Sequence, residues 1–228
     1  MPSSLSMQRQ SWLKVGVFWL ALTPLAWLIW AAFFDQLGAN PAQALVRATG
    51  DWTLRMLCLV LAITPLRSVF HIPALARLRR MLGLFMFFYA VLHLLSYSAF
   101  DMGFDFFEIG HDIVKRPFIL LGFTAFLITT CLAATSFNSA IKIIGGKNWK
   151  RLHQLVYVVA ILALLHFYWM RAAKSDFLDV LVYASIIGLL LGWRLLRWTR
   201  EWVQCRSAER PAERSANTVG LVAHKQSK

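Results

Sequence analysis

Six long apolar segments constrain the fold of this chain more than any other feature of its sequence. Each contains about the 20 residues that an α-helix needs to cross the hydrocarbon core of a bilayer. Inside a bilayer every backbone polar group must be satisfied within the protein, so such segments cross as helices. We therefore predict an all-α fold, a polytopic membrane helix bundle with six transmembrane helices. The predicted spans are about Lys14 to Phe34, Trp52 to Phe70, Met81 to Phe100, Pro117 to Thr135, Leu152 to Met170 and Phe177 to Trp198.

The composition agrees with a membrane protein. Hydrophobic residues make up 58% of the 228 residues, charged residues only 15%, and the mean hydropathy is +0.56. These values are too apolar for a soluble globule of this length. The first apolar segment exceeds the length of about 7 to 15 residues typical of a signal peptide, and no clear cleavage site follows it, so we expect it to be retained.

Basic residues are divided unevenly between the two sides of the predicted bundle. If both termini are cytoplasmic, 18 of the 24 Lys and Arg residues lie on the cytoplasmic side and six on the other. Short loops rich in Lys and Arg stay inside, which predicts this orientation. The net charge of +13 then indicates anionic membrane lipid, and no nucleic acid, as a partner. The six basic residues on the outer side are Arg47, Arg55, Lys115, Arg116, Arg171 and Lys174.

Three histidines, His93, His153 and His166, lie inside the apolar spans. An ionisable side chain at bilayer depth usually marks a functional site, and imidazole is a common axial ligand of haem iron. His93 and His166 are expected at similar depth in the outer half of the bundle. On one continuous fifth helix, His153 would lie about 20 Å from His166 and point about 140° away, near the cytoplasmic end. The alternative for a lone intramembrane histidine is a hydrogen bond to a neighbouring helix.

Each of two histidines precedes a tyrosine by four residues: Tyr97 follows His93, and Tyr157 follows His153. Residues with this spacing share one face of a helix, so the rings could flank a cofactor in the bundle. Tyrosines near the membrane interface are the alternative. Asp112 to Pro117 is a candidate docking segment for a periplasmic partner. The last 30 residues, which lack an apolar period, predict a flexible cytoplasmic tail at 199–228 after a haem domain at 1–198.

Several local motifs together resemble the haem-binding membrane subunits of the bacterial periplasmic protein-methionine-sulfoxide reductase system. These subunits belong to the ferric-reductase-like transmembrane group, which includes NADPH oxidases and metalloreductases. The resemblance covers about Leu13 to Trp198. The motifs are Arg79-Arg80-Met81-Leu82-Gly83-Leu84, Leu92-His93-Leu94 with Tyr97, Asp112 to Ile119, Leu132 to Ser136, Trp149 to Tyr157, and His166-Phe167-Tyr168-Trp169.

The resemblance implies a b-type haem protein of the bacterial inner membrane with one haem, possibly two. It also implies FMN, the quinone pool, and a separate periplasmic molybdenum-cofactor enzyme that receives the electrons and repairs oxidised proteins. The wider group carries two histidines on each of two helices, whereas this chain has Arg79 or Arg80 at one of those positions. We therefore expect a bis-histidine outer haem on His93 and His166. An inner haem on His153 lacks an obvious second ligand.

We expect basic residues to gather near His153 at the inner side. Arg79, Arg80, Lys150 and Arg151 suit the propionates of a haem or the phosphate of a flavin, because paired cationic donors attract such anions. A membrane anchor is the alternative for Arg79 and Arg80. No dinucleotide-binding fingerprint follows the sixth span, so the electrons are expected from membrane quinol or a cytoplasmic flavin reductase.

These features predict an electron-transfer subunit of an oxidoreductase complex, with catalysis in its partner. A stand-alone ferric or quinone reductase would use the same haem. A non-redox transporter would need none, but no Asp or Glu lies in the middle of a predicted span to serve as an ion or proton site.

Overall fold

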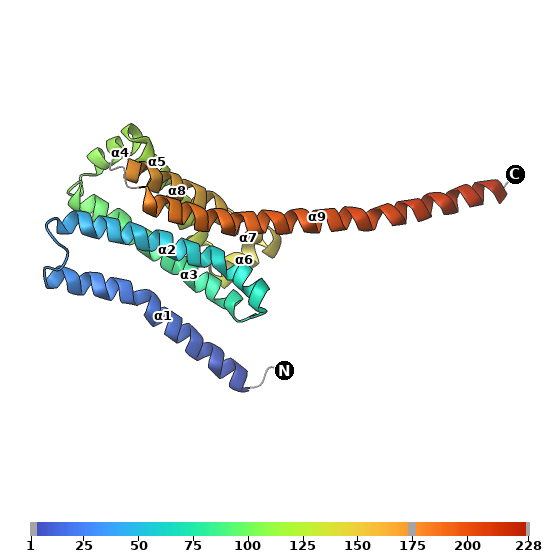
Figure 1. Cartoon of the computed structure of the whole chain (residues 1–228), viewed down its shortest axis with the longest axis horizontal. Helices are drawn as coiled ribbons and strands as arrows, with labels where there is room; N and C mark the ends of the chain where they lie inside the picture. Colours follow the sequence, from blue (N-terminus) through green and yellow to red (C-terminus); the bar gives the residue numbers. More distant parts are fainter. Residues whose placement is uncertain (1–3, 173–176, 227–228) are drawn as a thin grey trace. The chain divides into compact units, whose positions relative to one another are not determined.

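The computed structural model describes residues 4–172 and 177–226, and the side chains of residues 11–172 and 177–204. All its regular elements are helices (Figure 1). Six stretches within them are long and apolar enough to cross a membrane, which confirms the predicted all-α fold with six membrane helices. The helices are α1 (Ser4–Phe33), α2 (Pro41–Phe70), α3 (Leu75–Phe100), α4 (Phe106–Lys115), α5 (Pro117–Ala134), α6 (Asn138–Ile144), α7 (Gly146–His153), α8 (Val156–Ala172) and α9 (Leu178–Gln226).

Local sequence explains where several helices begin. The side chain of Asn40 caps α2 by accepting a hydrogen bond from the backbone N–H of Gln43, and Pro41 occupies the first turn. Asp105 caps α4 by accepting from the N–H groups of Phe107 and Glu108. A second proline at a first helical position, Pro117, begins α5.

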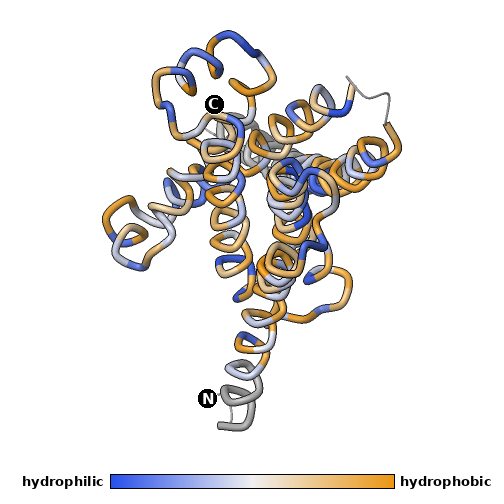
Figure 2. The backbone as a smooth tube through the Cα atoms, turned by 90° about the vertical axis from the view of Figure 1, so that its left-hand side faces the viewer, coloured by the Kyte–Doolittle hydropathy of each residue, from blue (hydrophilic) through white to orange (hydrophobic). Residues whose placement is uncertain are grey.

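Two helix hairpins form the centre of the bundle. Helices α2 and α3 pack along each other, α5 packs along α8, and α3 joins the hairpins by contacting α5 (Figure 1). Helix α1 packs on the first hairpin, where the buried hydroxyl of Tyr89 donates to the carbonyl of Ala21 at 2.8 Å. Hydrophobic residues run along most of the length of these helices (Figure 2). Many of the large ones are exposed. In a bilayer these exposed side chains would face lipid.

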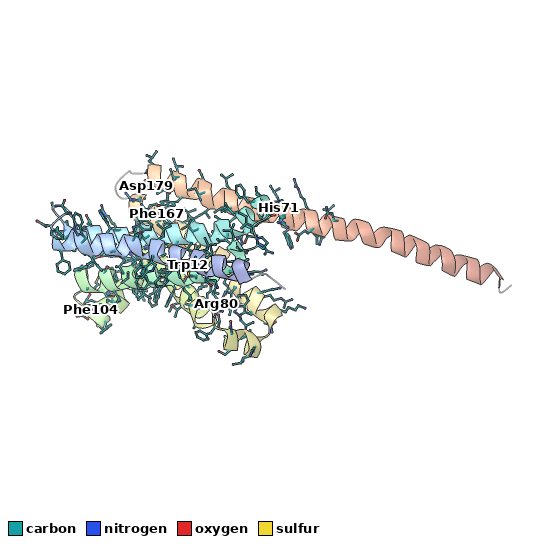
Figure 3. The ribbon with its side chains drawn as sticks, turned by 90° about the horizontal axis from the view of Figure 1, so that it is seen from below. Trp12, His71, Arg80, Phe104, Phe167 and Asp179 are labelled. Atoms are coloured by element: carbon teal, nitrogen blue, oxygen red, sulfur yellow. The ribbon has the colours of Figure 1, made fainter. Side chains whose placement is uncertain are left out.

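The helices of the bundle run between two ends. We name them the α4 end and the α6 end, after the short helix that lies at each. At the α4 end lie the loop after α3, with Phe104, and the start of α9, with Asp179 (Figure 3). At the α6 end lie the α2–α3 turn, with His71, and the start of α3, with Arg80 (Figure 3). Which end faces the periplasm stays a prediction from the charge distribution.

Two differences from the predicted spans bear on the candidate site. The second span was expected to start at Trp52 because Asp51 interrupts its apolar run, but α2 begins at Pro41 and includes Asp51. The fifth span was expected to be one continuous helix, but α7 ends at His153 and α8 begins at Val156. Between them Gln154, Leu155 and Tyr157 each donate a backbone hydrogen bond to the residue three positions earlier, which tightens the chain into a turn.

The break after α7 changes the expected relation between two histidines. His153 and His166 lie on different helices, so the 140° rotation expected from one ideal helix does not apply. It also separates His153 from Tyr157, which therefore do not share the face of one helix. His93 and Tyr97 do, because both lie on α3.

Residues up to Ile187 form one compact unit, and residues from Gly188 onward form a second one. Helix α9 continues to Gln226, through the segment that was expected to lack regular structure. The flexibility of residues 199–228 and the domain boundary at 198 stay predictions. The candidate site lies entirely in the first unit.

Candidate functional site

Two of the three intramembrane histidines meet in the bundle. His93 on α3 and His166 on α8 come from different hairpins, and their ring centroids lie 6.3 Å apart with an interplanar angle of 72°. Both side chains lie toward the α4 end, six or seven residues before their helices end. The structure thus brings together the pair that the sequence placed at similar depth.

Each of these histidines forms a hydrogen bond to the backbone of a neighbouring helix. The Nδ1 of His93 lies 2.9 Å from the carbonyl oxygen of Val46 on α2, and the Nδ1 of His166 lies 2.7 Å from that of Phe118 on α5. A carbonyl can only accept, so each Nδ1 carries the proton and donates it. The neutral ring then has its lone pair on Nε2, the atom that can bind a metal.

A cavity of about 370 Å³ surrounds the two rings. Its volume falls within the range of about 300 to 1,000 Å³ that is usual for small-molecule and cofactor sites. Away from the α4 end its walls are apolar, with side chains such as Leu57, Met86, Phe126 and Val159. Such walls exclude water from whatever the cavity holds.

Charged side chains line the same cavity toward the α4 end. Three are arginines from three different helices or their caps: Arg47, Arg116 and Arg171. Asp51 and Asp101 accompany them. Five donor N–H groups on each guanidinium suit the binding of carboxylates, so this end of the cavity can hold an anionic group.

A buried carboxylate orients one of these arginines. Asp112 on α4 accepts a 2.6 Å hydrogen bond from the Tyr97 hydroxyl and forms a 2.8 Å ion pair with Nε of Arg116. Its side chain is only 10% exposed. The expected docking role of Asp112 to Pro117 through exposed charges therefore does not extend to Asp112 itself, because its carboxylate is buried and links α3, α4 and the start of α5.

The geometry fits a haem. Two collinear metal–imidazole bonds of about 2.0 to 2.1 Å, with about 1.1 Å from each nitrogen to its ring centre, place two axial rings roughly 6.3 Å apart. The observed separation is 6.3 Å. Within the described residues no group of three or more His, Cys, Asp or Glu could hold a metal ion by itself. A haem needs only axial ligands from the protein, because the porphyrin supplies the others.

The third histidine lies apart from this cavity, at the α6 end. The ring of His153 stacks on that of Trp149 at 4.0 Å, and its Nδ1 lies 3.1 Å from the Trp149 carbonyl oxygen. Its Nε2 is buried and has no partner of good hydrogen-bond geometry among the described residues, although the backbone of Leu132 on α5 lies close to the ring. Arg79, which is half-buried, is close enough for electrostatic interaction with this ring.

The other predicted residues at the α6 end do not converge on one point. Nη1 of Arg80 donates to the side-chain oxygen of Asn138 on α6 at 2.7 Å, and Arg151 is exposed on α7. The structure therefore associates Arg79 with His153, whereas Arg80 connects α3 to α6.

This chain is similar in sequence to known proteins, both in its central region and over most of its length. The model of the ferric reductase like transmembrane component matches residues 49–164. A protein-methionine-sulfoxide reductase heme-binding subunit MsrQ from Polaromonas naphthalenivorans is 63% identical over 203 residues, which cover 87% of this chain and 91% of that protein. The chain belongs to this family of reductase subunits.

Two further members support the assignment to this family. The subunit of the same name from Herminiimonas arsenicoxydans is 50% identical over 78% of this chain and 82% of its own length. That from Ralstonia nicotianae is 44% identical over 86% and 90%. The chain is thus a multi-pass membrane protein of a redox family, similar along most of its length to subunits of methionine sulfoxide reductases.

Sequence reasoning missed the arginines that line the cavity of this family member. Arg47 and Arg171 entered only as basic residues on the side where the charge rule disfavours them, and Arg116 also as part of the docking segment Asp112 to Pro117. Their position on the outer side was a usable signal. Short loops on that side usually have few basic residues, so an arginine that lies there can have a local anionic partner. Arg55, a fourth such residue, does not line the cavity: its Nε donates to the Tyr183 hydroxyl at 3.2 Å, and its guanidinium lies over the Trp52 ring.

Proposed function

We propose that this chain is the haem-binding electron-transfer subunit of a periplasmic protein-methionine-sulfoxide reductase system, with one b-type haem held between His93 and His166. The observation that carries the proposal is the 6.3 Å separation of the two rings with both Nδ1 atoms bonded to backbone carbonyls. The heme-binding names of the similar subunits support it.

The residues of the cavity have distinct roles in this proposal. The Nε2 atoms of His93 and His166 would hold the iron, and the apolar walls would keep water away. Arg47, Arg116 and Arg171 hold the propionate carboxylates at the α4 end. A haem in this site supplies reversible one-electron chemistry, whose potential the axial ligands and nearby charges set.

The proposed direction of electron flow rests on the orientation of the two ends of the bundle that the distribution of basic residues predicts. The α4 end faces the periplasm, where a molybdenum-cofactor catalytic subunit receives the electrons and reduces methionine sulfoxide in oxidised proteins. The α6 end faces the cytoplasm of a bacterium across its inner membrane. The donor is membrane quinol or a cytoplasmic flavin reductase, and anionic lipid surrounds the basic α6 end.

His153 and Arg79 form the proposed inner relay. The buried Nε2 of His153, which has no partner of good hydrogen-bond geometry, is a polar atom that a second haem or FMN would satisfy. Arg79, Arg80 and Arg151 supply positive charge for haem propionates or a flavin phosphate. This relay is required if the donor acts from the cytoplasm, because the outer haem lies too deep for direct contact.

An absorption spectrum of the purified, dithionite-reduced protein tests the proposal. We expect the bands of a low-spin b haem, and we expect His93→Ala and His166→Ala to abolish the same spectral component. His153→Ala should leave that component intact. Unchanged low-spin spectra in both of the first two variants would overturn the assignment of the ligands.

A reconstituted assay tests the partner. Electron transfer that requires the periplasmic catalytic subunit is the expected result. Equal reduction of ferric iron or quinone without that subunit would instead favour a stand-alone reductase. A purified protein that never acquires haem would exclude both of these and favour a non-redox role.

A further inference from the structure

Both histidines of the candidate haem site approach a glycine on the neighbouring helix. A Cβ atom added to Gly50 on α2 would lie 3.0 Å from Cε1 and 3.1 Å from Nδ1 of His93. A Cβ added to Gly122 on α5 would lie 2.8 Å from Nδ1 and 2.9 Å from Cε1 of His166. Contacts below 3.0 Å force a shift, and those just above are tight. Each imidazole therefore occupies the space that a side chain on the facing helix would need.

The two glycines have the same position relative to the carbonyls that the histidines use. Val46 precedes Gly50 by four residues, and Phe118 precedes Gly122 by four residues. In an α-helix a carbonyl accepts from the N–H four residues later, and the Cβ of that later residue leans back over the preceding turn. Without a Cβ at this position, the ring of a facing histidine can reach the carbonyl from the side. At Val46 the histidine shares the carbonyl with the Thr49 hydroxyl, which lies 3.0 Å away.

This arrangement occurs once in each hairpin. In α2–α3 the first helix supplies the carbonyl and the glycine, and the second supplies His93. In the α5–α8 pair α5 supplies them and α8 supplies His166. The hydrogen bonds join residues 47 and 48 positions apart, so two separate parts of the sequence build the same contact.

We infer that Gly50 and Gly122 are positioning residues that open a carbonyl on the facing helix to each histidine and so commit Nδ1 as the donor and Nε2 as the ligand. This inference rests on the proposed haem function. A hydrogen bond from the distal nitrogen fixes the tautomer and the ring orientation and makes the ligand more basic. The glycines thereby set the strength of both axial bonds without touching the iron.

The inference predicts the effect of single alanine substitutions in the full-length, haem-loaded protein. Gly122→Ala should displace His166 and Gly50→Ala should displace His93, with the larger effect at Gly122 because its contact is shorter. We expect a fraction of ferrous haem that binds carbon monoxide, a loss of the low-spin ferric signal, and about tenfold weaker haem retention. The midpoint potential of the remaining low-spin haem should rise, because a less basic imidazole stabilises ferric iron less.

Gly83→Ala is the matched control. Gly83 lies on α3, the helix of His93, and a Cβ added there meets no atom within 4 Å. It should match the wild type in carbon monoxide binding, low-spin signal and potential. If Gly50→Ala and Gly122→Ala also match the wild type while it shows a bis-histidine spectrum, the inference fails and the proposed function stands. If the wild type lacks that spectrum, the proposed function itself fails.

A double-mutant cycle separates positioning from general packing. In a His166→Ala background the imidazole that Gly122→Ala displaces is gone, so the second substitution should have no further effect on haem retention. Gly50→Ala should keep its effect in that background. Should Gly122→Ala alone fail to accumulate in membranes, recovery in the double variant supports the inference. If neither Gly122→Ala nor the double variant accumulates, the inference is contradicted, because the added methyl group would then clash with a group other than His166.

Discussion

Both ends of this bundle contain at least one histidine within a membrane helix, but the histidines at the two ends have different kinds of contact. At the α4 end, His93 and His166 bond to carbonyls on other helices, and their rings meet across two hairpins. At the α6 end, His153 stacks on Trp149 and bonds to the carbonyl of that same residue, within one turn of α7. The first contacts join separate helices, whereas the second lie within one turn of α7, which is itself joined to the end of α5 by the 2.8 Å hydrogen bond from the Trp149 indole to the Thr135 carbonyl.

This difference indicates how rigidly each end can hold a metal. The rings of His93 and His166 are fixed by hydrogen bonds between helices and both line the cavity, so together they suit the two ligand positions of the proposed haem. His153 offers a single nitrogen, with a basic side chain nearby in place of a second histidine. In the proposed function, the α4 end would hold a haem firmly and the α6 end would hold its cofactor more weakly.

The sharpest test of the comparison asks which end faces outward. In a background without Cys58, Cys131 and Cys205, single cysteines replace the exposed residues Ala39 and Gly110 near the α4 end and Ser139 on α6. We expect an impermeant thiol reagent to label the first two in intact spheroplasts and the third only after lysis, an all-or-none difference. The reverse pattern would invert the proposed direction of electron flow.

The next largest effect concerns the proposed relay at the α6 end. His153→Ala should slow reduction of the outer haem by a cytoplasmic flavin donor by about tenfold, since loss of a cofactor's support commonly costs 10- to 100-fold. Reduction by dithionite should stay complete. His71→Ala, an exposed histidine at the same end, serves as the control in stopped-flow measurements. Wild-type kinetics in the His153→Ala protein would favour a quinol that enters from the bilayer.

A smaller effect is expected at the buried carboxylate of the α4 end. Asp112→Asn weakens the bonds to Tyr97 and Arg116, and hydrogen bonds to a charged group contribute about 2 kcal/mol. The free energy of unfolding in detergent should fall by roughly that amount. Glu108→Gln, at an exposed position on the same helix, should leave it unchanged. Equal stabilities of the two variants would show that Asp112 does not hold the α4 end together.

The smallest effect concerns the potential of the haem. Removal of the positive charge in Arg47→Gln disfavours the added electron, so the midpoint potential should fall. For roughly 1 kcal/mol of charge interaction the fall is about 40 mV. Arg55→Gln removes a charge from the same helix outside the cavity and should give a smaller fall in a redox titration. A larger fall in midpoint potential for Arg55→Gln than for Arg47→Gln would contradict the placement of the haem propionates beside Arg47.

The sequence predicted the existence of the membrane spans better than it predicted where their helices begin and end. Length and apolarity are local properties, so all six membrane helices could be found from the residues alone. The start of α2 was misplaced because Asp51 was treated as a loop residue, although it lies inside the helix and lines the cavity among arginines. The break between α7 and α8 was missed because no proline or glycine marks it.

By itself the sequence determined that this chain forms membrane helices, and that His93 and His166 lie at similar depth. Helical rise and hydropathy suffice for both conclusions. Only the tertiary structure decided which groups surround these histidines: the carbonyls of Val46 and Phe118 and the glycines that follow them. Those contacts join residues 47 and 48 positions apart. No local pattern encodes them, because they depend on how one helix packs against another.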